Sequence, residues 1–212
     1  MSFGYPVMLE VAGRRCVVIG GIAVRERKVE GLLAAGATDV LVVAEGIDGR
    51  FDGSPEVRVE RRAWRPADLE GAFLVIASSG DAATRAAIAG EARTRGALVN
   101  VMDDVPSCDW AAPAVVRRGD LVVAVGTGGA SPAVARLLRE RLEGAFDPAW
   151  VELLRIVAEV REQTQVSIPM FEERARRWRE ALDLDEAVEL VRRGLTEELR
   201  ARLRERLLAG AS

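Results

Sequence analysis

The sequence predicts an α/β protein whose first part is a Rossmann-like, doubly wound parallel sheet. Short apolar runs alternate with helical patterns up to about residue 102, and this alternation is typical of βαβ units. Two glycines follow the first apolar run directly, and a helical pattern follows them. Beyond residue 103 the pattern changes, and we expect a small β/α segment and then a helical C-terminal domain. The predicted domains are residues 1–112, 113–146 and 147–212.

Five strands are predicted in the first domain, each as a short run rich in Val, Leu or Ile. They cover residues 15–19, 39–43, 56–60, 73–77 and 97–102. Residues 73–77 are apolar without interruption, as is typical of a central parallel strand that is buried on both faces. Helices are predicted over residues 23–35 and 81–94, and Gly36 ends the first of them.

The second part of the chain begins with two β-rich runs, residues 113–118 and 120–125. Gly119 separates them, which predicts a hairpin. From Pro148 onward the pattern is helical and charged, with apolar residues gathered on one face of each helix. These helices are therefore expected to pack against one another.

A glycine-rich loop, residues 126–132, follows the predicted hairpin and leads into a helix that ends near residue 143. Ser131 suits the N-cap of this helix and Pro132 its first position. A glycine-rich loop at a helix N-terminus can hold an anion, although a flexible connector has the same composition. The loop lacks the Lys-Ser/Thr ending of a Walker A motif, which argues against nucleoside triphosphate hydrolysis.

Composition excludes several kinds of chemistry. The 212 residues include no histidine, which removes the usual general base, Ser-His and Cys-His pairs, and His-ligated metals. Acid–base work then falls to Asp, Glu, Lys, Cys or Tyr, and we predict no resident metal. The formal net charge of −3 gives no electrostatic footprint for nucleic acid.

The two cysteines predict the compartment. Cys16 and Cys108 are far apart and form no Cys-x-x-Cys motif, which favours a reducing compartment over a disulfide framework. No stretch approaches the ~20 apolar residues of a membrane span, and no secretory leader is recognised. We therefore expect a cytoplasmic protein without membrane contact.

The glycine turn after the first strand predicts a dinucleotide site. Gly20 and Gly21 allow a sharp turn, after which the helix N-terminus directs free N–H groups at a pyrophosphate. Glu45 follows the second strand at roughly the ~20–25 residue spacing at which an acid binds ribose hydroxyls, which favours NAD over NADP. Ile22 and Arg25, however, occupy the second and third positions of the Gly-x-Gly-x-x-Gly/Ala fingerprint. A tight turn in an ordinary α/β fold is the alternative.

A second candidate site lies at the end of the last predicted strand of the sheet, where residues 100–104 read Asn-Val-Met-Asp-Asp. Open α/β sheets bind ligands outside the carboxyl ends of their strands. In the absence of histidine, Asp103 and Asp104 are the best proton acceptors at this end. The alternative is that they cap a helix or form a turn.

Several stretches, in order over roughly residues 5–145, together resemble one family. They are Tyr5-Pro6-Val7, Cys16-Val-Val-Ile-Gly-Gly21, Glu26-Arg27-Lys28, Leu33-Ala-Ala-Gly-Ala37, Asn100-Val-Met-Asp-Asp104, Cys108-Asp109, Pro113-Ala-Val-Val-Arg-Arg-Gly-Asp-Leu121, Thr127-Gly-Gly129 and Ser131-Pro-Ala-Val-Ala-Arg136. With them the chain resembles the precorrin-2 dehydrogenase/sirohydrochlorin ferrochelatase family, which includes the N-terminal part of the sirohaem synthases. The C-terminal region resembles this family only in being helical.

The resemblance implies a Rossmann domain, a central segment that forms a homodimer, and a small helical domain. It implies NAD-dependent oxidation of precorrin-2 to sirohydrochlorin and, in many members, insertion of Fe²⁺. Asp103 matches the aspartate implicated in both steps. The positions implied for NAD are Gly20, Gly21, Ile22, Ala23, Val24, Glu45, Gly46, Ser78 and Ser79. Those expected to hold the carboxylate-rich tetrapyrrole are Asn100, Arg117, Arg118, Thr127, Gly128, Gly129 and Ser131.

The glycine turn departs from the family pattern. The family normally reads Gly-Gly-Gly-x-Val-Ala there, whereas this chain has Ile22 and Arg25 at two of these positions. Two other functions therefore stay open. One is a degenerate homologue that chelates metal or binds tetrapyrrole without NAD, and the other is a non-enzymatic dinucleotide-sensing module.

Overall fold

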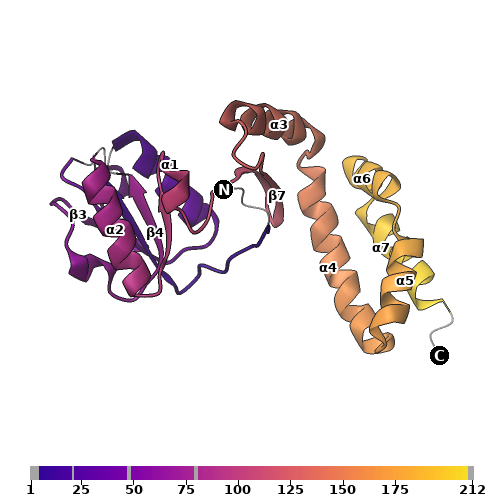
Figure 1. Cartoon of the computed structure of the whole chain (residues 1–212). Coiled ribbons are helices and arrows are strands. Elements are labelled where there is room, and N and C mark those ends of the chain that lie inside the picture. Colours follow the sequence, from indigo (N-terminus) through magenta and orange to yellow (C-terminus); the bar gives the residue numbers. More distant parts are fainter. Residues whose placement is uncertain (1–4, 21, 47–48, 79–80, 210–212) are drawn as a thin grey trace. The chain divides into compact units, whose positions relative to one another are not determined.

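The chain divides into two units, Met1–Ala112 and Pro113–Ser212 (Figure 1). This computed structural model describes residues 5–20, 22–46, 49–78 and 81–209, apart from the side chains of residues 22–25. Each unit has its own buried apolar residues and is described by itself. The boundary between the units falls between Ala112 and Pro113.

The first unit contains a five-stranded sheet in the order β3-β2-β1-β4-β5, and every neighbouring pair is parallel. The strands are β1 (Arg15–Gly20), β2 (Asp39–Val43), β3 (Val57–Glu60), β4 (Ala72–Ser78) and β5 (Leu98–Val101). Each of them lies within two residues of the strand that the apolar runs predict. The predicted α/β class with a Rossmann-like sheet is confirmed.

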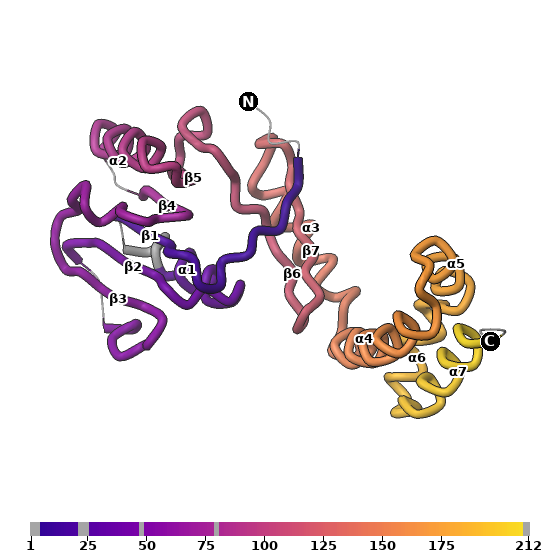
Figure 2. The backbone as a smooth tube through the Cα atoms, turned by 90° about the horizontal axis from the view of Figure 1, so that it is seen from below, coloured from indigo at the N-terminus to yellow at the C-terminus, as the bar shows by residue number. Residues whose placement is uncertain are grey.

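Two helices cover opposite faces of this sheet (Figure 2). Helix α1 (Ile22–Ala34) contributes Val29 and Leu32 to one apolar cluster, and helix α2 (Ala82–Thr94) contributes Ile88 to the other. Successive strand residues alternate between the two clusters because side chains of a strand point to alternate faces. The sheet is therefore doubly wound, as predicted, and its strands β1, β2 and β4 are buried on both sides.

Three short 3₁₀ helices complete the first unit. They are η1 (Gly49–Phe51), η2 (Pro66–Leu69) and η3 (Val105–Ser107). Helix η2 carries Asp68, a buried carboxylate that accepts hydrogen bonds from Arg62 at 2.7 and 2.8 Å and from the Arg65 amide at 2.7 Å. This buried charge is fully paired, which is what allows it to be buried.

The second unit begins with an antiparallel hairpin of β6 (Ala114–Arg118) and β7 (Leu121–Val125), as the two β-rich runs predict. Gly119 in its turn has a φ of +55°, a value that favours glycine. Helix α3 (Pro132–Ala145) follows, and the Ser131 hydroxyl accepts a hydrogen bond of 3.3 Å from the Val134 amide. Ser131 is thus the N-cap that the sequence predicts.

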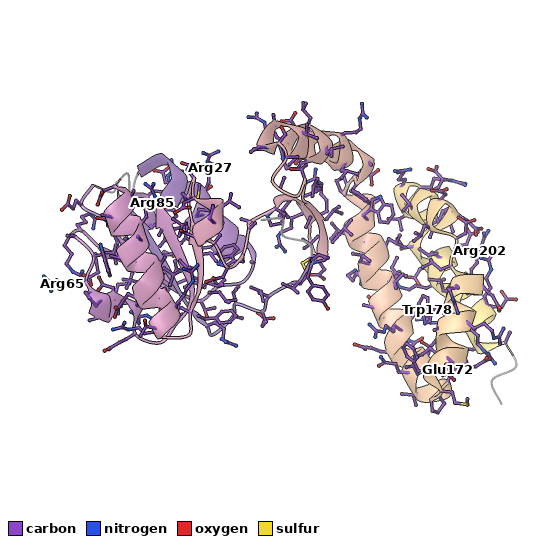
Figure 3. The ribbon with its side chains drawn as sticks, in the orientation of Figure 1. Arg27, Arg65, Arg85, Glu172, Trp178 and Arg202 are labelled. Atoms are coloured by element: carbon purple, nitrogen blue, oxygen red, sulfur yellow. The ribbon has the colours of Figure 1, made fainter. Side chains whose placement is uncertain are left out.

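Four further helices form the rest of the second unit. They are α4 (Ala149–Ser167), α5 (Phe171–Ala181), α6 (Leu184–Arg192) and α7 (Thr196–Leu208). Leu153, Ile156 and Leu207 belong to their shared apolar core, and Trp178 from α5 packs against it (Figure 3). The apolar faces predicted for these helices are therefore packed together. No helix within the described ranges is long and apolar enough to cross a membrane.

Candidate functional site

The carboxyl ends of the parallel strands lie at one edge of the sheet, and most of the predicted site residues lie there. Gly20 at the end of β1 is in register with Ser78 at the end of β4, and Ala77 is in register with Val101 at the end of β5. The strand order reverses between β1 and β4, since the chain runs from β1 outward to β3 and then returns to β4. Ligands of open α/β sheets bind at such a reversal.

The glycine turn joins β1 to α1 at this reversal. Gly20 has a φ of +104°, which residues with a side chain rarely adopt. Ile22, Ala23 and Val24 form the first turn of α1, so their amides belong to the group that has no partner within the helix. Gly21 lies outside the described residues. Gly20 and the free amides of the first turn of α1 are backbone features that dinucleotide sites use to bind a diphosphate.

Two pairs of neighbouring positions complete the predicted cofactor set. Glu45 and Gly46 follow the end of β2 and are exposed. The Ser78 hydroxyl donates a hydrogen bond of 3.2 Å to the Ile19 carbonyl, while Ser79 lies outside the described residues. Glu45 thus lies at the same sheet edge as the glycine turn, just beyond β2, which is the strand next to β1. This is the arrangement that dinucleotide-binding sheets use for the ribose hydroxyls.

Asp103 lies just beyond β5 at the same edge. Its φ is +61°, and no other non-glycine residue in the described part of the chain has a positive φ. The side chain is exposed, and its carboxylate has no hydrogen-bond or ion-pair partner among the residues described. Asp104 occupies the N-cap position of η3 without making a side-chain cap bond. The Asp103 carboxylate is therefore available to a ligand rather than used to cap a helix.

The Asn100 side chain on β5 forms a hydrogen bond within the fold. Its side chain is buried, and Nδ2 donates a hydrogen bond of 2.9 Å to the Trp110 carbonyl. This bond fastens residues 108–110 along the free side of β5. The predicted contact between Asn100 and the tetrapyrrole is untested and stays a prediction.

The other residues predicted to hold substrate belong to the second unit. Arg117 on β6 is exposed, whereas the Arg118 guanidinium donates to the Phe146 carbonyl at 3.0 Å and pairs with Glu143 at 3.5 Å. These contacts attach the hairpin to the end of α3. The role of Arg118 in the fold is thus clear from its contacts, and its predicted role toward substrate stays a prediction.

The glycine-rich loop before α3 is held by its own side chains. The Thr127 hydroxyl donates to the Ser131 carbonyl at 3.2 Å and accepts from the Ser131 amide at 3.3 Å. Gly128 and Gly129 have φ values of +60° and +86°. The loop is therefore a closed turn, and its predicted contact with substrate remains to be tested.

Sequence reasoning used Cys108 and Asp109 only as marks of a resemblance and did not see their local role. Asp109 accepts a hydrogen bond of 3.0 Å from the Val99 amide, and Cys108 accepts one of 3.1 Å from the Val101 amide. The sequence did offer one indication of this role, because Cys108 and Asp109 follow soon after residues 97–102, the last predicted strand of the sheet. In the described ranges, no group of three or more Cys, Asp or Glu side chains is placed to hold a metal ion.

Comparison with known proteins supports this reading of the first unit. Residues 7–114 match the family model described as "Putative NAD(P)-binding", and residues 118–145 match "Sirohaem biosynthesis protein central". The chain belongs to the family described as "Putative NAD(P)-binding", whose model matches about half of it. The unit that contains the glycine turn, Glu45 and Asp103 is the family's NAD(P)-binding domain.

Curated relatives in the sirohaem family are similar over most of this chain. It is 38% identical to a sirohaem synthase of Methylococcus capsulatus over 197 residues and 33% identical to one of Chromobacterium violaceum over 210 residues. These alignments cover 91% and 98% of the chain but 41% and 44% of the relatives. The chain therefore spans less than half the length of these sirohaem synthases.

A solved structure of the precorrin-2 dehydrogenase SirC has the same fold. It superposes with a TM-score of 0.67 at 24% sequence identity and covers 96% of this chain and 97% of its own. At this identity the likeness shows only that the two chains share a fold.

Proposed function

We propose that the chain oxidises precorrin-2 to sirohydrochlorin with NAD, with Asp103 as the proton acceptor. The observation that carries this proposal is the exposed Asp103 carboxylate, which has no partner among the residues described and lies at the same sheet edge as the glycine turn. The sirohaem synthases among the relatives and the precorrin-2 dehydrogenase fold support the choice of substrate.

The backbone of the first unit fits NAD. Gly20, with its positive φ, and the first-turn amides of Ala23 and Val24 would hold the diphosphate. Glu45 would accept hydrogen bonds from the adenosine ribose, and its charge would repel the 2′-phosphate of NADP. Gly46 and Ser78 would lie beside the same cofactor, and Gly21, Ile22 and Ser79 stay predicted members of the cofactor set.

Oxidation of precorrin-2 removes two protons and two electrons from the macrocycle. NAD, when bound, supplies the acceptor for one hydrogen together with both electrons, as hydride. Asp103 removes the other hydrogen as a proton, which an exposed carboxylate without a competing partner can accept and pass to water. Histidine is not needed for this step, in agreement with its absence from the sequence.

The same carboxylate supports a second activity, insertion of Fe²⁺ into sirohydrochlorin. This step releases two protons from pyrrole nitrogens, and Asp103 would accept them in turn. Fe²⁺ is then a substrate and not a resident metal. NAD takes no part in this activity, so it would survive a weakened cofactor site at Ile22 and Arg25.

The second unit would supply the homodimer and contacts to substrate. Val134, Leu137 and Leu138 on α3 are exposed, at 48%, 65% and 40% of their surface. An apolar helix face of this kind favours association, here with a second copy. The tetrapyrrole carries many carboxylates, for which Arg117 and the amides of the 127–131 loop are suitable ligands. We propose a cytoplasmic location because both cysteines are free thiols.

The test is anaerobic incubation of the purified protein with precorrin-2 and NAD, followed by absorption spectroscopy. The proposal predicts that NADH and sirohydrochlorin form in equal amounts and that omission of NAD stops both. Binding of sirohydrochlorin or uptake of Fe²⁺ without any NADH formation would instead support the homologue that works without NAD. NAD binding without any change in the tetrapyrrole spectrum would support the dinucleotide-sensing module.

A further inference from the structure

The free side of β5 is capped by two side chains instead of a sixth strand. In β5 the Val99 and Val101 amides donate to the Asp109 carboxylate and to the Cys108 sulfur, at 3.0 and 3.1 Å. Both valines are buried, so these amides need partners within the protein. The Met102 amide, by contrast, donates to Ala77 on β4 at 2.8 Å. Cys108 and Asp109 thus satisfy the donors that β4 cannot reach.

The Cys108 thiol also bonds to the turn that contains Asp103. Its sulfur lies 3.1 Å from the Val101 carbonyl and 3.3 Å from the Asp104 carbonyl. The single S–H proton can be donated to either carbonyl, while the sulfur accepts from the Val101 amide. Burial raises the pKa of the Cys108 thiol, which keeps this proton on the sulfur at neutral pH. Cys108 therefore joins the residues on either side of Asp103.

Asp103 needs such support because its backbone is strained. A φ of +61° in a residue other than glycine costs roughly 1 kcal/mol and persists when the surroundings fix the chain. The Asp104 amide donates to the Val101 carbonyl at 3.3 Å, which closes the turn around Asp103. The Cys108 sulfur contacts both of these residues and closes the same turn from its open side.

The segment that contains Cys108 is anchored independently beyond it. Arg93 on α2 donates to the Asp109 carboxylate at 3.0 Å and to the Ser107 carbonyl at 2.8 Å. The Asp109 amide donates to the Val99 carbonyl at 2.8 Å. Loss of the Cys108 thiol would therefore loosen the turn at Asp103 while residues 107–110 stay attached to the sheet.

We propose that Cys108 is a positioning residue, whose thiol holds the 101–104 turn so that the Asp103 carboxylate faces the bound tetrapyrrole. This inference rests on the proposed function, in which Asp103 accepts a proton from that substrate. Cys108 itself touches neither substrate nor cofactor in this role. Its effect is on where the carboxylate lies, and a displacement of about 1 Å can cost up to ~100-fold in rate.

The test compares Cys108→Ala, Cys108→Ser and Cys16→Ala with the wild-type protein. Steady-state kinetics with precorrin-2 and NAD give kcat and KM, and amide hydrogen exchange reports the turn. Cys108→Ala is expected to lower kcat about tenfold to a hundredfold with little change in either KM, and to accelerate exchange at Val101 and Asp104. The hydroxyl of Cys108→Ser can donate and accept in the same way as the thiol. This variant is therefore expected to keep the wild-type kcat and the wild-type exchange rates at Val101 and Asp104. Cys16→Ala, which removes a buried thiol from β1, is expected to keep kcat.

Two results would overturn the inference. One is a wild-type kcat in Cys108→Ala, and the other is a loss of kcat while the Val101 and Asp104 amides stay as protected as in the wild type. A wild-type protein that does not convert precorrin-2 would contradict the proposed function instead. The exchange comparison would still decide whether Cys108 holds the turn, because it does not depend on turnover.

Discussion

The Ser78 hydroxyl donates a hydrogen bond of 3.2 Å to the Ile19 carbonyl, which joins the carboxyl end of β4 to that of β1. These are the two strands between which the strand order reverses. The bond therefore fastens the two strand ends at the reversal, which is where an open α/β sheet binds its ligand. Gly20 directly follows Ile19, so the glycine turn begins from a fastened strand end.

Substitution of Gly20 tests the glycine turn. At a φ of +104° a side chain is strained, and Gly20→Ala is expected to lower the free energy of unfolding by at least about 1 kcal/mol. The added Cβ would also separate the backbone from a diphosphate, so NAD affinity should fall. Chemical denaturation and calorimetric titration with NAD measure the two effects.

Gly31→Ala is the matched control. Gly31 lies inside α1, and a Cβ built there meets nothing within 4 Å. Alanine should stabilise the helix by roughly 0.5–1 kcal/mol and leave NAD binding unchanged. Equal losses of NAD affinity in the two variants would argue against a cofactor role for the turn.

Replacement of Glu45 tests the choice between NAD and NADP. Glu45→Gln removes a charged acceptor for the ribose hydroxyls, which is worth about 1.5–3 kcal/mol, or roughly tenfold to a hundredfold in NAD affinity. NADP should bind more tightly to Glu45→Gln than to the wild type, because its 2′-phosphate is no longer repelled by the Glu45 charge. Titration of both dinucleotides measures this shift, and Glu70→Gln, an exposed acid elsewhere in the unit, serves as control. An unchanged preference would exclude Glu45 from the cofactor site.

The ion pair between Asp68 and Arg62 predicts a pH-dependent stability. The hydrogen bonds from the Arg62 guanidinium are the main reason that the pKa of the Asp68 carboxyl lies below its ordinary value of 3.8. A carboxyl whose pKa is lower in the folded state stabilises the fold above its unfolded pKa, and this contribution disappears as the pH falls through the folded pKa. Asp68→Asn should therefore cost about 2 kcal/mol at neutral pH, and the difference from the wild type should shrink in acid.

Urea denaturation of the wild type and Asp68→Asn from about pH 6 down to about pH 2 measures this dependence. Glu56→Gln is a suitable control, because the Glu56 carboxylate is half-buried and accepts a hydrogen bond from the Ser54 hydroxyl rather than from an arginine. A constant difference between the wild type and Asp68→Asn across the whole range would show that the pair does not act through its charge.

The exposed face of α3 predicts dimerisation. Leu137→Asp places a charge where 65% of the leucine surface is exposed, and it should raise the dimer dissociation constant about tenfold or more. Arg136→Ala makes the same change of net charge on the same helix and should leave association unchanged. Sedimentation over a range of concentrations measures both. A wild-type protein that is monomeric throughout would contradict the proposal.

The sheet could be predicted from the sequence because most of its strands are buried on both faces. Such strands appear as continuous apolar runs, and the run at 73–77 lies within β4 (Ala72–Ser78). Glycine and proline gave the boundaries of several helices, since Gly36 has a φ of +87° beyond α1 and Pro132 begins α3. Local chemistry was sufficient for these elements.

The site was predicted less completely because its geometry depends on contacts between distant residues. Asp103 has its positive φ inside a turn that Cys108 closes through bonds to Val101 and Asp104, and nothing in the residue type of Asp103 requires that φ. Arg118 bonds to a carbonyl 28 residues away, at Phe146, which no motif indicates. A pattern of residue types predicts which groups are present, whereas their partners come from the fold.

Comparison of Asp103→Asn with Asp104→Asn tests the central claim most directly. The two carboxylates are adjacent, and only that of Asp103 is proposed to accept the proton. NADH formation from precorrin-2 and NAD is the measurement, with calorimetry to verify that NAD still binds. Asp103→Asn is expected to lower kcat by about 100-fold or more while Asp104→Asn keeps it within about threefold. A kcat close to the wild-type value in Asp103→Asn would contradict the account.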